Sequence, residues 1–163
     1  MIDVIDLKKT FGDLEVLKGI NVTINKGDIV VVIGPSGSGK STFLRCLNCM
    51  EDPTSGSIIF NGVDIADMRV DINIHRRHMG MVFQHFNLFN NMTVIENIMM
   101  APVYVRCKEL KKAKRKGTLA SDAPKTKAEI KAQAREEALE LLRRIGLEDK
   151  ADVYPSTLSG GQK

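Results

Sequence analysis

The chain has 163 residues, of which 43% are hydrophobic and 27% are charged. This composition is typical of a soluble globular protein and excludes a disordered, collagen-like or disulfide-framework protein. The longest apolar run, Ile29–Ile33, is far shorter than the ~20 residues that a membrane-spanning helix needs. Charged residues from Asp3 onward interrupt the first apolar residues, so no secretory signal is expected. The three cysteines, an odd number, fit a reducing compartment, and we therefore expect a cytosolic protein with free thiols.

The net charge of +4 is concentrated in one segment of the chain. Residues 101–150 contain fourteen Lys/Arg and eight Asp/Glu, whereas the remainder contains ten and twelve. Because the basic character belongs to that segment alone, overall charge gives no argument for nucleic-acid binding, and no nucleic-acid partner is expected.

Apolar patterning predicts β-structure in the first third of the chain. Ile2–Leu7 alternates apolar and acidic residues, which indicates a strand with one solvent-exposed face, and Val16–Ile24 is a second candidate strand. Ile29–Ile33 is β-branched at every position, which is typical of a strand buried on both faces in a parallel sheet. Apolar residues at helical spacing then predict a helix over Ser41–Met50.

Two further strand signals follow. Asn61-Gly62 separates the apolar segments Ser57–Phe60 and Val63–Ile65, and this dipeptide favours a hairpin with a type I′ turn. Met79–Phe83 is another apolar candidate strand.

The remainder of the chain is predicted to be helical. Thr93 with Glu96 forms a capping box that opens a helix through Met100, and Pro102 is expected to disturb that helix. Residues 106–127 are predicted to be a basic surface loop, for which a solvated face is a simpler interpretation than a lipid or nucleic-acid contact.

A second capping box, Thr126 with Glu129, predicts another helix. Gly146 is a plausible terminator of that helix. Its apolar residues are expected to share one face; they are Ile130, Ala134, Ala138, Leu141 and Ile145.

The strongest chemical signal is a glycine-rich loop between the predicted buried strand and the Ser41–Met50 helix. Its residues match the phosphate-loop pattern of Gly, four residues, then Gly-Lys-Ser/Thr; they are Gly34, Pro35, Ser36, Gly37, Ser38, Gly39, Lys40 and Ser41, with Thr42 next in the chain. Glycines allow backbone N–H groups to surround a polyphosphate, and the following helix adds the positive end of its dipole. Lys40 is expected to reach the β- and γ-phosphates, and the Ser41 hydroxyl to bind Mg²⁺. The alternative is a glycine-rich turn without a ligand.

A second glycine-containing loop lies far downstream at Leu158-Ser159-Gly160-Gly161-Gln162. Alone it is compatible with a linker, but a serine followed by two glycines also forms a backbone nest that accepts anions. Two phosphate-binding loops so far apart indicate a nucleotide shared between two chains.

These segments, with FGDLEVLKGI, PTSGSIIFNGVDI, GMVFQHFNLFNNMTVIENI and YPSTLSGGQ, resemble the nucleotide-binding domain of ATP-binding cassette (ABC) transporters. The subfamily that serves bacterial polar amino acid importers is the most similar. The resemblance implies that Phe11 stacks on adenine with Val16 beside it. It also implies that Gln84 contacts Mg²⁺ and the attacking water. Residues Ser159, Gly160, Gly161 and Gln162 would form the signature loop that closes on ATP of an opposite subunit.

The resemblance also implies a fold class and partners. The fold is expected to be an α/β P-loop domain of ABC type, with an antiparallel β-element, a parallel core sheet over residues 1–87 and a helical subdomain over 88–163. ATP and Mg²⁺ are the expected ligands. The expected partners are a second nucleotide-binding domain, transmembrane permease subunits and, indirectly, an extracytoplasmic solute-binding protein. The expected location is cytoplasmic, on the inner face of the cell membrane.

Residues 1–163 depart from the family pattern because they contain no apolar strand ending in Asp-Glu and no following switch histidine. We therefore expect a C-terminally incomplete domain without its metal-holding Asp and general-base Glu, which does not hydrolyse ATP and has poor solubility. Three alternatives remain open: an importer ATPase for another solute, a non-catalytic fragment, and, remotely, a DNA-associated ABC ATPase. Cys46 and Cys49 form a Cys-x-x-Cys pair, for which two buried thiols are a simpler interpretation than a zinc or redox site.

Overall fold

The computed structural model describes residues 1–120 and 123–163. The described chain divides into two compact units, Met1–Val82 and Phe83–Lys163, so the boundary lies slightly before the expected one after residue 87. Among the described residues, no helix is both long and apolar enough to cross a membrane.

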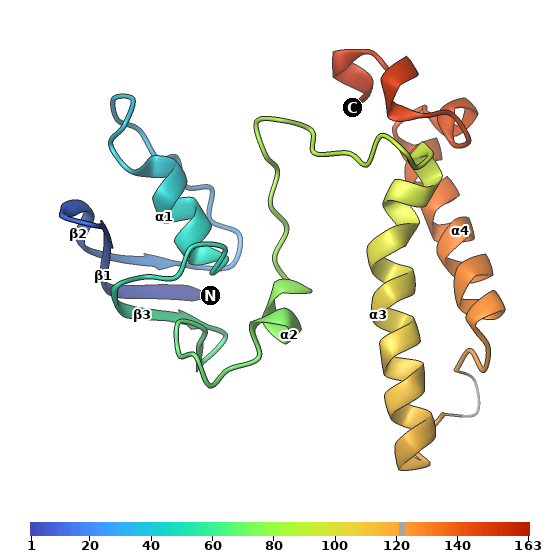
Figure 1. Cartoon of the computed structure of the whole chain (residues 1–163), viewed down its shortest axis with the longest axis horizontal. Helices are drawn as coiled ribbons and strands as arrows, with labels where there is room; N and C mark the ends of the chain where they lie inside the picture. Colours follow the sequence, from blue (N-terminus) through green and yellow to red (C-terminus); the bar gives the residue numbers. More distant parts are fainter. Residues whose placement is uncertain (121–122) are drawn as a thin grey trace. The chain divides into compact units, whose positions relative to one another are not determined.

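The first unit contains a four-stranded antiparallel sheet (Figure 1). The strands are β1 (Ile2–Phe11), β2 (Leu14–Ile24), β3 (Ser55–Phe60) and β4 (Val63–Asp64), arranged in the order β2-β1-β3-β4. This sheet is the predicted antiparallel β-element.

The β3–β4 hairpin forms as predicted. Asn61 and Gly62 have φ angles of 49° and 84°, and two consecutive positive values are characteristic of a type I′ turn. The carboxylate of Asp64 accepts hydrogen bonds from the N–H groups of Ile58 and Ala66, both at 3.1 Å, which fixes the short second strand.

Helix α1 (Lys40–Leu47) packs against this sheet and shares its hydrophobic core. It ends earlier than predicted, because Asn48 is its C-cap and Cys49 has a positive φ of 47°. The buried core residues are Val4, Leu7, Leu17, Phe43, Cys46, Cys49, Ile58, Phe60 and Ile65.

Two predicted strands, Ile29–Ile33 and Met79–Phe83, do not form among the described residues. Ile29 is 94% exposed and Val82 is 98% exposed. A strand becomes stable by pairing its backbone and burying its side chains against neighbours, and neither segment pairs with a strand of the described sheet. The predicted parallel core sheet is therefore not part of the described structure.

A short helix that the sequence did not predict, α2 (Ile72–Arg76), follows the hairpin. Its Arg76 guanidinium donates to the backbone carbonyls of Asn48 (3.0 Å) and Cys49, at the C-terminal end of α1. This contact holds the segment after β4 against the helix that begins with Lys40.

The described residues of the second unit form two long helices followed by three single-turn 3₁₀ helices (Figure 1). The long helices are α3 (Val94–Lys116) and α4 (Lys127–Arg144), and the short ones are η1 (Glu148–Lys150), η2 (Pro155–Thr157) and η3 (Gly160–Gln162). The Thr93–Glu96 capping box forms in full. At the start of α4, the Glu129 N–H donates to the Thr126 hydroxyl (3.1 Å), but Glu129 accepts from the Lys125 N–H instead of that of Thr126.

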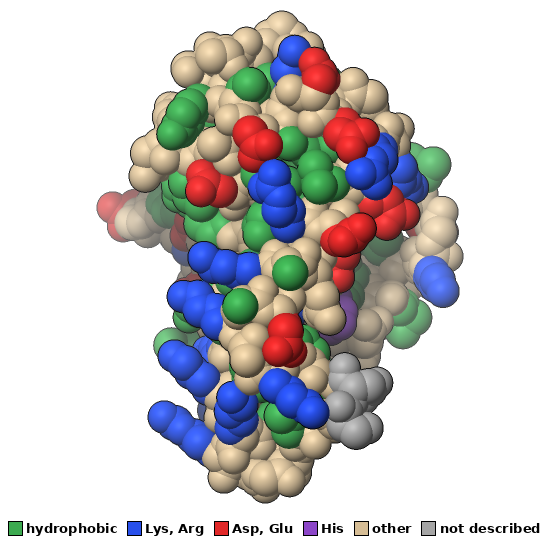
Figure 2. Space-filling model, turned by 90° about the vertical axis from the view of Figure 1, so that its right-hand side faces the viewer, with side chains coloured by type: hydrophobic (Ala, Val, Ile, Leu, Met, Phe, Trp, Pro, Cys, Tyr) green, Lys and Arg blue, Asp and Glu red, His purple; other side chains and the backbone are tan. Residues whose placement is uncertain are grey.

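Helix α3 continues past Pro102 to Lys116, so the predicted disturbance at Pro102 and the loop expected to begin at residue 106 are both wrong. An interior proline removes one backbone hydrogen bond and costs roughly 3 kcal/mol, which packing of α3 against α4 offsets. Beyond the proline, Arg106 forms an ion pair with Glu137 of α4 at 2.7 Å. The lysines near the C-terminal end of α3 are exposed, and Figure 2 shows several Lys and Arg side chains in the lower part of the face in view. Residues 121–122 of the predicted loop lie outside the described residues.

The buried face of α4 differs from the predicted one at its C-terminal end. The buried residues follow a strict four-residue spacing and are Ile130, Ala134, Ala138 and Leu142. Leu141 is 50% exposed and Ile145 is 66% exposed, so Leu142 replaces them in the core with Ile95 and Ala151. Gly146 ends the helical turn as predicted, with a φ of 69°.

Leu142 and Leu141 provide a matched test of this packing. Leu142→Ala should lower the free energy of unfolding by about 2–5 kcal/mol, because it leaves a cavity in the α3–α4 core. Leu141→Ala removes the same atoms from an exposed side chain and should change the free energy by less than about 1 kcal/mol. Urea unfolding followed by far-ultraviolet circular dichroism measures both changes, and a larger loss for Leu141→Ala would contradict the assigned face.

Candidate functional site

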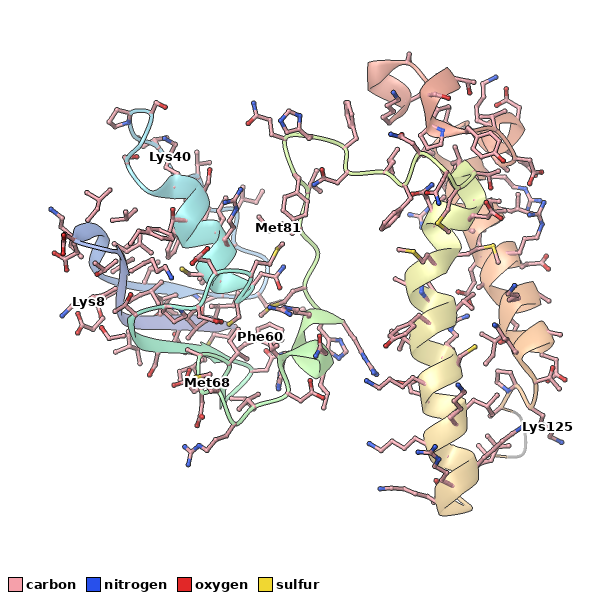
Figure 3. All side chains as sticks on the ribbon, viewed as in Figure 1. Lys8, Lys40, Phe60, Met68, Met81 and Lys125 are labelled. Carbon is pink, nitrogen blue, oxygen red and sulfur yellow. The ribbon has the colours of Figure 1, made fainter. Side chains whose placement is uncertain are left out.

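The glycine-rich loop leads directly into α1, as the motif predicts. Gly39 is the N-cap of α1 in a left-handed conformation, with a φ of 87°, and Lys40 is the first helical residue. The Lys40 ammonium lies beside the loop (Figure 3), where it donates to the carbonyls of Gly34 (2.8 Å) and Pro35 (2.7 Å) and to the Ser38 hydroxyl (3.5 Å). The Lys40 ammonium therefore links the first turn of α1 to the backbone at the start of the loop.

A hollow of about 300 Å³ lies over the start of α1. Its lining consists of the loop and first-turn residues with one strand residue, namely Val16, Ser36, Gly37, Ser38, Gly39, Lys40, Ser41 and Thr42. No side chain caps α1 among the described residues, and its first turn contains no acidic residue. The first N–H groups of a helix have no partner within that helix, so this hollow combines free backbone donors, a helix dipole and a lysine. These are the features that anion-binding sites at helix N-termini share.

Gly39 is required at the contact between the loop and β2. A Cβ atom at this position would lie 2.9 Å from Val16 Cγ1 and 3.1 Å from Leu17 Cδ2. The absence of a side chain thus allows the start of α1 to approach the strand that carries Val16. The family resemblance implies that Val16 lies beside Phe11 at adenine, which stays a prediction; in the structure Val16 lines the hollow.

Phe11 is the last residue of β1 and is 45% exposed. The Lys9 ammonium lies 4.7 Å from the centroid of the Phe11 ring. Lys9 also forms an ion pair with Glu51 at 2.6 Å. Sequence reasoning missed Lys9; the signal that could have indicated it is its position two residues before Phe11, on the same face of one strand.

Gln84 and the signature loop belong to the second unit. Gln84 is exposed in the segment between α2 and α3. Ser159 is exposed before η3, and its N–H donates to the Gln162 side chain (3.0 Å), while Leu158 and Pro155 are buried beneath the loop. The pairing of Gln84 with Ser41 at a metal ion remains a prediction.

The described residues contain no cluster of three or more His, Cys, Asp or Glu side chains that could hold a metal ion. Cys46 and Cys49 are free thiols in the core, and burial raises the pKa of Cys46 to about 11. The Cys49 thiol donates to the carbonyl of Ile65 (3.2 Å). A buried, protonated thiol is a poor nucleophile and a poor metal ligand, so these cysteines belong to the core.

A larger hollow, of about 580 Å³, lies between α3 and α4. Apolar side chains of α3 face cationic side chains of α4 there, including Lys131 and Arg135. Its described lining contains none of the predicted phosphate-binding residues, so the smaller hollow over α1 is the candidate site.

Comparison with known proteins assigns the chain to a family. Residues 17–163, which include the loop, Gln84 and the signature segment, match the family model described as ABC transporter. The chain belongs to the ABC transporter family. An ABC cassette solved as a dimer, described as the post-hydrolysis state of the ATP-binding cassette MJ0796 bound to ADP and Pi, is 29% identical with a TM-score of 0.72. The match covers 99% of this chain and 65% of that chain, and it supports the P-loop fold of ABC type.

The curated relatives of this ABC chain are transport proteins. It is 46% identical to the glutamine transport ATP-binding protein GlnQ of Geobacillus stearothermophilus over 96% of its own length and 56% of the relative. It is 48% identical to the arginine transport ATP-binding protein ArtM of Bacillus subtilis over 100% of its own length and 59% of the relative. The chain thus spans somewhat more than half the length of the relatives that it matches. These matches confirm the predicted resemblance to the amino acid transport subfamily.

Gly39 and Gly37 allow a test of the loop geometry. Both have a left-handed φ (87° and 81°), but a Cβ at Gly37 would meet no atom within 4 Å. Gly37→Ala should therefore add only backbone strain, about 1–2 kcal/mol. Gly39→Ala should cost a further 1–3 kcal/mol or so, because its methyl group overlaps with β2. Urea unfolding measures both losses, and equal losses would contradict the close contact between loop and strand.

Proposed function

We propose that this chain binds ATP at the loop over α1, as part of the ATP-binding subunit of an importer for polar amino acids. The single observation that carries the proposal is the hollow over α1, where Lys40, a left-handed Gly39 and an uncapped helix N-terminus converge. The membership in the ABC transporter family supports it. The whole protein couples ATP binding and hydrolysis to transport.

Each part of the loop has a chemical role in this proposal. The N–H groups of the first turn of α1 donate to phosphate oxygens, and Lys40 exchanges its carbonyl partners for the β- and γ-phosphates. The Phe11 ring stacks on adenine. The hydroxyl of Ser41, which lines the hollow, is the proposed protein ligand of a Mg²⁺ ion.

The residues present fit a metal ion that arrives with the nucleotide, because Mg²⁺ is commonly held by few protein groups together with substrate phosphates. No described cluster of carboxylates or histidines offers a site of its own. When bound, Mg²⁺ neutralises charge that develops on the transferred phosphoryl group. Gln84 is proposed to reach the same ion and the attacking water.

The signature loop is proposed to act on the nucleotide of a second copy. The buried Leu158 supports the exposed Gly160 and Gly161, whose backbone is proposed to face a partner. The dimeric cassette MJ0796, described as bound to ADP and Pi, supports this arrangement. Transmembrane permease subunits and an extracytoplasmic solute-binding protein complete the proposed importer, at the inner face of the membrane.

The proposed cargo, a polar amino acid, rests on the relatives, which are described as glutamine and arginine transport proteins. The nucleotide-binding subunit does not contact the cargo in such an arrangement, so its residues do not directly indicate which solute is transported. The genes beside this one should encode an amino-acid-type binding protein and permease. A neighbouring binding protein for sugar or iron would contradict the cargo.

Lys40→Ala should weaken Mg-ATP binding by about tenfold or more, because a charge-assisted contact to phosphate contributes roughly 1.5–3 kcal/mol. Lys26→Ala is the matched control: it removes the same charge from an exposed residue between β2 and the loop and should leave the affinity unchanged. Titration of a fluorescent ATP analogue into the folded variants measures the affinities. Equal affinities of the unmodified chain and Lys40→Ala would refute the proposal.

The 163-residue chain should bind ATP without turning it over. Each described glutamate lies in a helix, in β2 or directly after α1, and none follows the C-terminal end of a strand where a general base would meet the attacking water. Without such a base, the rate typically falls about 10²–10⁴-fold. A phosphate-release assay on the purified chain measures the rate. Steady hydrolysis that disappears in Lys40→Ala would contradict this expectation.

A further inference from the structure

Lys9 connects the end of β1 to the segment that follows α1. Its ammonium lies 4.7 Å from the centroid of the Phe11 ring, within the distance at which a cation is attracted to an aromatic face. The two residues are two positions apart on β1, and this contact brings their side chains together. The cation therefore covers one part of the ring surface.

The same ammonium is anchored on its other side. It forms an ion pair with Glu51 at 2.6 Å and donates to the carbonyl of Asp52 at 2.8 Å. The Lys9 side chain is only 13% exposed and that of Glu51 is 30% exposed, so solvent screens this pair less than a surface pair. The Glu51 N–H in turn donates to the carbonyl of Arg45 in the last turn of α1 (3.3 Å).

These contacts form a continuous connection from α1, whose first residues bind phosphate in the proposed function, to the aromatic ring at the end of β1. Two contacts thus set the position of Phe11 relative to the loop. Before α1, Gly39 lies close to β2, and after α1, Glu51 forms an ion pair with Lys9 of β1. Phe11 is 45% exposed, so part of the residue remains accessible to a base.

We infer that Lys9 is a positioning residue for the base of the bound nucleotide, because its contact with the Phe11 ring and its ion pair with Glu51 fix the ring relative to the segment that follows α1. The inference rests on the proposed ATP site and adds to it a residue that contacts neither phosphate nor base. Because Lys9 holds the Phe11 ring in place before the nucleotide binds, less conformational entropy is lost on binding. The effect is specific to the base and leaves the phosphate contacts unchanged.

The test compares two ligands, Mg-ATP and magnesium tripolyphosphate, which lacks a base. Lys9→Met should weaken ATP binding about three- to tenfold, through loss of ring positioning and part of the base stacking. It should leave tripolyphosphate binding unchanged. Lys9→Arg retains a cation over the ring and should restore the ATP affinity. In a Phe11→Ala background, Lys9→Met should have no further effect on ATP binding.

Folding is controlled in the same experiment. If Lys9→Met unfolds the chain because Glu51 is left unpaired, Lys9→Met combined with Glu51→Gln removes that charge and is compared with Glu51→Gln alone. An equal loss for both ligands indicates a merely structural role and overturns the inference, as does an unchanged preference for ATP over tripolyphosphate. A chain that binds neither ligand, or binds ATP equally well with Lys40→Ala, refutes the proposed function itself.

Discussion

The close contact between Gly39 and β2 is the constraint on which the candidate site depends. Because no Cβ separates Gly39 from Val16 and Leu17, the start of α1 lies against the strand. The helix then places Phe43 and Cys46 in the core and leaves its first N–H groups at the hollow. A bulky residue at Gly39 would displace the helix and the hollow together, so loop chemistry and core packing cannot vary independently.

Local chemistry explains which features could be predicted from the sequence. The Asn61-Gly62 turn and the Thr93–Glu96 capping box depend on residues a few positions apart, and both form as predicted. The glycine-rich loop leads into a helix as its motif indicates. The strand expected at Ile29–Ile33 depends on pairing with other strands, which a pattern within that segment cannot supply. Its side chains are instead exposed, from 38% at Val32 to 94% at Ile29.

The length of helix α3 and the contacts of Lys9 also could not be predicted from local sequence. A proline inside a helical pattern favours termination locally, yet Arg106 beyond it bonds Glu137 of another helix, and tertiary packing outweighs the local preference. For Lys9 the only local signal is its spacing from Phe11, because its partners Glu51 and Asp52 lie beyond the whole of α1. Contacts between distant segments decide both cases.

The exposed segment Ile29–Ile33, predicted as a strand, leaves Lys40 with a second role in the loop. Ile33 directly precedes the loop and is 87% exposed, so the sheet does not support the N-terminal side of the loop in the described structure. That side is held instead by the bonds from Lys40 to the carbonyls of Gly34 and Pro35. Lys40 is therefore a phosphate ligand in the proposed function and also holds the backbone of the loop together. Lys40→Ala removes both the phosphate contact and the bonds to the loop carbonyls. Lys40→Arg separates the two contributions, because it keeps the charge but changes the geometry of hydrogen-bond donation.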